Sequence, residues 1–193
     1  NLAPEDYDFG NIENYSFAME VTCSNDEARK MFILAYGHML NYNHEEAIAC
    51  FSKCAELDPD CAMAWWGIAY CVSSNYNWTP GLGSGYDPIQ MAISLKEGCS
   101  EMEQDLIDAL AERHSEEARD SADPSVLNMG NSAELNIAFA EAMAPLYEKY
   151  SGNLDVTAIY VEALMNLKAW QLWDKDTKTG EITPADENTL LLV

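Results

Sequence analysis

A helix–turn–helix pattern recurs in this chain after 34 residues, within residues 28–72. The apolar residues of one helical face return at matching positions, which are Met31, Leu34 and Ala35 in the first unit and Trp65, Ile68 and Ala69 in the second. Asp58-Pro59 ends the intervening helix, because proline cannot continue one. We expect Phe51 and Trp65 to fill the space between neighbouring helices. Recurring helical hairpins predict a row of stacked helices.

A period of 34 residues is typical of the tetratricopeptide repeat (TPR). We therefore expect an all-α fold, a right-handed α-solenoid of TPR-like helical hairpins over residues 23–193, with an extended N-terminal arm over residues 1–22. The expected helices cover residues 25–41, 44–57, 60–74, 88–98, 101–117, 132–150 and 154–168. Ser24 or Asn25 caps the first of them, Asn43 caps the second, and Ser100 forms a capping box with Glu103.

Two stretches, residues 23–80 and 132–189, resemble a family of TPR proteins known mainly as uncharacterised open reading frames. The residues that carry the resemblance are TCSNDEARKMF, YNHEEAIACF, DPDCAMAWWGIAY and YVEALMNLKAWQLWDKD. The resemblance implies the repeat fold but no established reaction. Members of that family usually continue into further helices rich in histidine, so the resemblance also implies that a C-terminal part is missing here.

Acidic side chains dominate the charge of this chain. There are 33 acidic and 10 basic residues, which gives a net charge of −23. Nucleic acid is therefore not an expected partner, because phosphate contacts need lysine and arginine. A solubilising acidic surface is one interpretation, and binding of a divalent cation or a basic partner is the other. No apolar run is long enough to span a membrane.

The six cysteines predict disulfide bonds, because their number is even and none lies in a CxxC pair. Cys23 precedes the first helix and Cys61 begins the third. The starts of successive first helices lie side by side in stacked hairpins, so this pair is the favoured disulfide. Two further hypothetical pairs are Cys50–Cys71 and Cys54–Cys99. The alternative is that the cysteines are free and pack as small apolar residues.

Two N-glycosylation sequons begin at Asn14 and Asn77. Both fall in segments without helical periodicity, where an acceptor asparagine is accessible. Together with paired cysteines they favour an extracellular location or the lumen of the secretory pathway. The first residue is Asn1 rather than methionine, which indicates a processed N-terminus or a missing start.

Two groups of residues are candidate metal ligands. His38 and His44 flank the first predicted turn and could share an ion with Glu45 or Glu46, although a lone histidine at a helix start more often caps or packs. A second, acidic group resembles a calcium loop and consists of Asp174, Asp176, Glu181 and Asp186. Lys178 occupies a ligand position there and Gly180 comes one residue late, so an ordinary acidic turn is the favoured interpretation. No other cofactor is expected.

Aromatic and apolar residues outside the predicted helices are candidate partner contacts. Residues 75–87 form a long loop rich in glycine and aromatic residues, and it carries Tyr76, Trp78 and Tyr86. The chain ends on Leu190, Leu191 and Leu192, which would leave core surface open in a solenoid. These leucines could dock on another copy and extend head-to-tail into a filament.

We therefore expect a non-enzymatic module, secreted and glycosylated, that binds a protein, a peptide or copies of itself. The alternative is a metal-dependent enzyme or metal-binding protein whose remaining site residues lie in a missing C-terminal part. A third hypothesis is an intracellular scaffold with six free thiols.

Overall fold

The computed structural model describes residues 19–77, 82–116 and 133–185. The described elements are α1 (Asp26–Leu40), α2 (His44–Leu57), α3 (Ala62–Val72), α4 (Tyr86–Leu95), the short 3₁₀ helix η3 (Lys96–Gly98), α5 (Glu101–Ala111), α8 (Ala133–Lys149), α9 (Leu154–Leu167), β1 (Trp173–Lys175) and β2 (Ile182–Pro184). The expected helices are all present. Their bounds lie within three residues of those predicted, except that α5 ends at Ala111, six residues before the predicted end. None of the described helices has the length and apolar character needed to span a bilayer.

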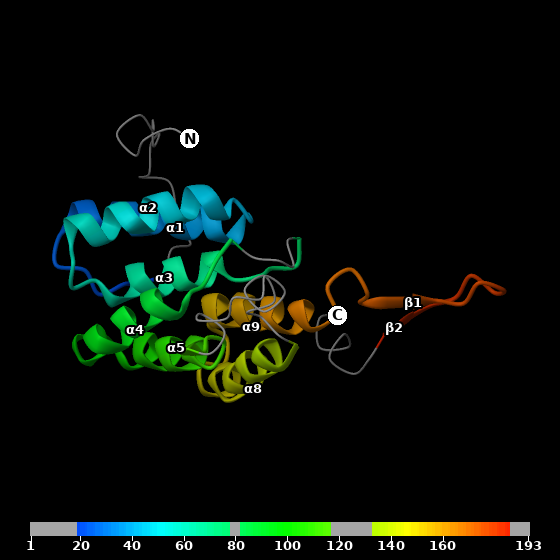
Figure 1. The fold of residues 1–193 in the computed structure, drawn as a ribbon. Helices are drawn as coiled ribbons and strands as arrows, with labels where there is room; N and C mark the ends of the chain where they lie inside the picture. Colours follow the sequence, from blue (N-terminus) through cyan, green and yellow to red (C-terminus); the bar gives the residue numbers. More distant parts are fainter. Residues whose placement is uncertain (1–18, 78–81, 117–132, 186–193) are drawn as a thin grey trace.

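Each helix packs against the next one along the chain, from α1 through α5 and then through α8 to α9 (Figure 1). Helices two apart also meet, because α1 contacts α3 and α3 contacts α5. The prediction of a mostly helical fold is confirmed for the described part of the chain. The all-α prediction is incomplete for residues 173–184, where the antiparallel pair β1–β2 extends away from the helices (Figure 1).

Local hydrogen bonds explain the β1–β2 hairpin. The Asp176 carboxylate accepts from the backbone N–H groups of Lys178 and Thr179, at 2.6 and 2.9 Å. Gly180 follows with φ 76°, a left-handed conformation that glycine adopts without a steric penalty. This turn reverses the chain between two short strands, which the all-α expectation for residues 23–193 did not include.

The helix starts follow the capping chemistry of the sequence. The Asn25 side chain accepts from the Ala28 N–H at 2.9 Å, and Ser100 and Glu103 form the predicted capping box. The Asn153 side chain caps α9 in the same way. Asn43 occupies the predicted N-cap position of α2, but its side chain makes no cap hydrogen bond there.

Helix α3 lies at the centre of the core. Most of its residues are buried, and Trp66 is fully buried with its indole N–H donating to the Leu106 carbonyl oxygen at 3.1 Å. Trp65, which the repeat pattern placed in the core, lies at its edge and is only partly buried. The reason is that α3 has neighbours on several sides, so one apolar stripe does not describe its buried surface.

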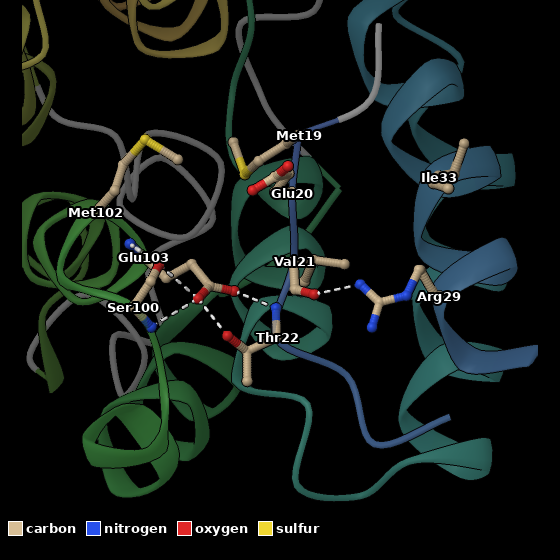
Figure 2. A pocket seen from close by; sticks show the side chains of 9 residues that line it. All are labelled: Met19, Glu20, Val21, Thr22, Arg29, Ile33, Ser100, Met102 and Glu103. Atoms are coloured by element: carbon tan, nitrogen blue, oxygen red, sulfur yellow. Dashed lines mark hydrogen bonds between the residues drawn. The ribbon is translucent and has the colours of Figure 1, made fainter. Parts of the chain in front are cut away.

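The segment before α1 is held against α5 by one buried carboxylate. Glu103 accepts from the backbone N–H and the hydroxyl of Thr22, at 2.7 and 2.6 Å, and it is 1% exposed (Figure 2). Arg29 of α1 donates to the Val21 and Cys23 carbonyl oxygens. A pocket of about 490 Å³ lies beside this segment. The predicted extended arm lies mostly outside the described residues.

We predict that Gly67→Ala lowers the free energy of unfolding by about 1–3 kcal/mol, because the new methyl group would overlap the buried Phe51 ring. Gly98→Ala is the matched control, since nothing lies within 4 Å of a Cβ at that position. Urea denaturation of both variants measures the difference. Equal stabilities for the two variants would contradict the close approach of α2 and α3.

Candidate functional site

The acidic face of α9 meets tyrosines from α1 and α3. Tyr36 donates to Asp155 Oδ1 at 2.9 Å, and Tyr70 donates to Glu162 Oε2 at 2.6 Å. Asn166 follows Glu162 by four residues and therefore lies on the same face of α9. We use the name polar cluster for His44, Tyr70, Glu162 and Asn166.

His44 enters the polar cluster from the start of α2. Its side chain is buried, with Nδ1 lying 3.1 Å from the Cys71 carbonyl oxygen and 3.2 Å from Asn75 Nδ2. Burial lowers the pKa of His44, and the nearby Glu162 carboxylate only partly opposes this effect. The imidazole is therefore neutral at pH 7.

Four buried side-chain atoms have no hydrogen-bond partner within the described part of the chain. They are His44 Nε2, Glu162 Oε1 and both polar atoms of the Asn166 amide. All four belong to the polar cluster. A buried polar atom without a partner costs about 1–3 kcal/mol, so native proteins rarely keep such atoms together unless another molecule pairs with them.

Glu162 dominates the electrostatics around the cluster. Burial raises the pKa of Tyr42 to about 12, and the Glu162 charge adds to this shift. Burial and then Glu162 also raise the pKa values of Tyr70 and Cys71. The buried Arg113 interacts with the Glu162 charge through space, but it donates its hydrogen bonds to Ser74 and Asn136.

A left-handed backbone conformation occurs at Tyr42, beside the cluster, and at Trp170. Tyr42 has φ 60° and Trp170 has φ 65°, although neither is a glycine. The Tyr42 ring stacks on His44 with centroids 5.8 Å apart, and Trp170 stacks on Tyr76 at 5.3 Å. Strained backbone of this kind concentrates at functional sites, where the surrounding structure holds it in place.

The sequence-predicted metal ligands lie in separate places. His38 and His44 flank the α1–α2 turn as expected, but His44 points into the polar cluster and contacts α3. Asp174, Asp176 and Glu181 are exposed on or beside the β1–β2 hairpin, and Asp186 lies outside the described residues. The calcium hypothesis remains a prediction.

The predicted partner and glycan residues are only partly described. Tyr76 is half-buried against Trp170, Tyr86 begins α4, and Asn77 is exposed. Asn14, Trp78 and Leu190–Leu192 lie outside the described residues. Glycosylation and head-to-tail assembly therefore remain predictions.

The structure brings the favoured cysteine pair together. Cys23 Sγ lies 3.2 Å from Cys61 Sγ, and both residues are free thiols. Cys54 belongs to the hypothetical Cys54–Cys99 pair, but its Sγ lies 3.9 Å from Cys61 Sγ. Cys50 and Cys71 are both buried thiols. The three disulfides remain predictions.

Sequence reasoning missed Glu162, Asn166 and Tyr70 as site residues. A signal was present, because Asp155, Glu162 and Asn166 place polar groups on one face of an otherwise apolar helix. The partners of that face lie more than 80 residues away, so spacing alone could not find them.

No protein-family model, curated protein or solved structure matches this chain. The resemblance to a TPR family therefore remains a prediction.

We predict that acid destabilises the fold through its buried histidines. Burial lowers the pKa of His114 to about 3, while the unfolded imidazole has a pKa of about 6.5. The unfolded chain therefore binds more protons below pH 6.5, and stability falls as the pH drops from there towards 3. His44 shifts in the same direction.

Urea denaturation at pH 7.5 and 5.5 tests this, with an expected loss of about 1 kcal/mol from His114 alone. His114→Gln should reduce the pH dependence. His38→Gln is the matched control, since it removes a histidine from a different part of the fold. A stability that stays constant between the two pH values would contradict the burial of neutral imidazoles.

Proposed function

We propose that this chain is a non-enzymatic binding module whose polar cluster receives a lysine or arginine side chain from a basic peptide or protein. The observation that supports this proposal most directly is the group of unpaired, buried polar atoms at His44, Glu162 and Asn166. A ligand that pairs them removes a penalty present in the free protein, so that penalty becomes binding free energy.

The chemistry of the unpaired atoms indicates which hydrogen-bonding groups the ligand carries. Glu162 Oε1 is an anionic acceptor, and the Asn166 amide offers both an acceptor and a donor. A peptide carries both kinds of group in its backbone, and a lysine or arginine side chain adds positively charged donors. Charge-assisted hydrogen bonds to a carboxylate are about twice as strong as neutral ones.

The surroundings of the cluster favour a cation as well. The Glu162 charge acts on Tyr42, and Tyr70 donates to the Glu162 carboxylate, so a cation bound at Glu162 would lie near two aromatic side chains. The net charge of −23 would also steer a basic partner towards this chain.

We also propose that the frame of this module is the TPR-like right-handed solenoid. The 34-residue recurrence, the packing of each helix on the next and the contacts α1–α3 and α3–α5 support it. A secreted or lumenal location is proposed with it, and the exposed Asn77 sequon supports that location.

Isothermal titration with a decapeptide of alternating lysine and glycine tests the proposal. The same peptide with acetylated lysines is the neutral control. We expect the charged peptide to bind and the neutral one to bind at least tenfold more weakly. Glu162→Gln should weaken binding at least tenfold, because it removes the buried charge but keeps an acceptor for Tyr70.

Glu148→Gln is the matched control, since it makes the same charge change at an exposed position of α8. Asn166→Leu should lose binding while the free energy of unfolding is kept or raised, because an apolar side chain of similar shape removes the two unpaired atoms of the amide. Peptide binding unaffected by both cluster variants would overturn the proposal.

A second arm of the titration uses zinc and manganese chlorides. If either ion binds in a way that depends on Glu162 and the peptide does not bind, the ligand of the polar cluster is a metal ion rather than a basic side chain. That result would favour the metal-binding alternative. Binding of the peptide without the ions supports the interaction module.

A further inference from the structure

Three cysteine thiols from three separate elements converge at the start of α3. The Sγ atoms of Cys23, Cys54 and Cys61 all lie within 4.8 Å of one another. Cys23 comes from the segment before α1, Cys54 from the last turn of α2, and Cys61 from the N-cap of α3. Cys54 and Cys61 are buried, whereas Cys23 is half-buried at the edge of the group.

Cys23 is fixed in this place by hydrogen bonds on both sides. Thr22 is bound by the buried Glu103 carboxylate (Figure 2), and Arg29 donates to the Cys23 carbonyl oxygen. Ser24 donates its backbone N–H to Asp58 Oδ2 at 2.5 Å, which ties the segment to the α2–α3 turn. The thiols are therefore brought together by the fold rather than by a flexible loop.

The start of α3 favours a thiolate in this group. Cys61 sits at the N-cap of α3, where the helix dipole favours negative charge.

We propose that Cys23, Cys54 and Cys61 form a trigonal thiolate site for a soft metal ion, Cu(I). The ion displaces the three thiol protons, which pass to the solvent, and is bound by the three thiolate sulfurs. Metal–sulfur bonds of about 2.3 Å in a trigonal arrangement separate the sulfurs by about 4 Å. The Cys54–Cys61 distance of 3.9 Å already has this value, and Cys23 needs to move only slightly from its 3.2 Å contact.

The number of ligands favours Cu(I) over zinc. Among the described residues, the group contains three candidate ligands and no fourth histidine, cysteine or carboxylate. Structural zinc sites are almost always four-coordinate, whereas soft thiolate ligands also select Cu(I).

The site excludes the predicted Cys23–Cys61 disulfide, because that bond consumes two of its three ligands. A disulfide also leaves no role for Cys54, although Cys54 is as close to Cys61 as a metal site requires. The two states are therefore distinguishable by experiment.

Competition between the reduced full-length chain and bicinchoninate for Cu(I) tests the proposal under anaerobic conditions. We expect one Cu(I) per chain and a sulfur-to-metal charge-transfer absorbance. Cys54→Ser should weaken binding at least tenfold. Cys50→Ser is the matched control, since it changes another buried cysteine of α2 that lies outside the group.

Cys23→Ser is a second variant, at the half-buried edge, and it keeps the test valid if Cys54→Ser fails to fold. Glu103→Gln should weaken Cu(I) binding by a smaller factor, because it only loosens the segment that positions Cys23.

Equal Cu(I) binding by the wild type and the Cys23 and Cys54 variants would overturn the proposal. So would a chain purified without added oxidant whose mass is lower by two hydrogen atoms and whose Cys23 and Cys61 peptides are linked. That result would establish the disulfide.

Discussion

Two tyrosine–carboxylate hydrogen bonds join the late part of this chain to its beginning. Tyr36 of α1 binds Asp155, and Tyr70 of α3 binds Glu162, so the polar face of α9 lies against the first two hairpins. These bonds are made by long side chains across the space between the helices. Helices packed through small apolar residues would approach more closely and leave no room for polar atoms between them.

The same arrangement creates the unpaired atoms of the polar cluster. Once Tyr70 occupies one oxygen of Glu162, the other oxygen and the Asn166 amide face a region that no described side chain fills with partners. Sequences optimised for stability alone would replace these groups by apolar residues, because unpaired buried polar atoms lower stability. Their presence, beside the left-handed Tyr42, is the basis of the binding role proposed for this part of the fold.

Helix α3 links the two sites proposed for this chain. Its N-terminal end carries Cys61 among the three thiols, and its C-terminal end carries Tyr70 and the carbonyl group that contacts His44. Because α3 is buried almost all round and contains Gly67 against Phe51, it holds both ends in fixed positions. Soft sulfur ligands at one end and oxygen and nitrogen groups at the other give the two sites different ligand preferences.

The sequence by itself determined the local structure. Apolar periodicity gave the helices, Asn25 and the Ser100–Glu103 box gave two of their starts, and the repeat spacing brought Cys23 and Cys61 together. These features depend on neighbours a few residues away or on one repeat length. The tertiary structure alone decided that Glu162 meets Tyr70, that Cys54 joins the thiol group, and that Trp66 rather than Trp65 fills the core. Each of these depends on how helices far apart in the chain pack around α3, and no local pattern encodes that geometry.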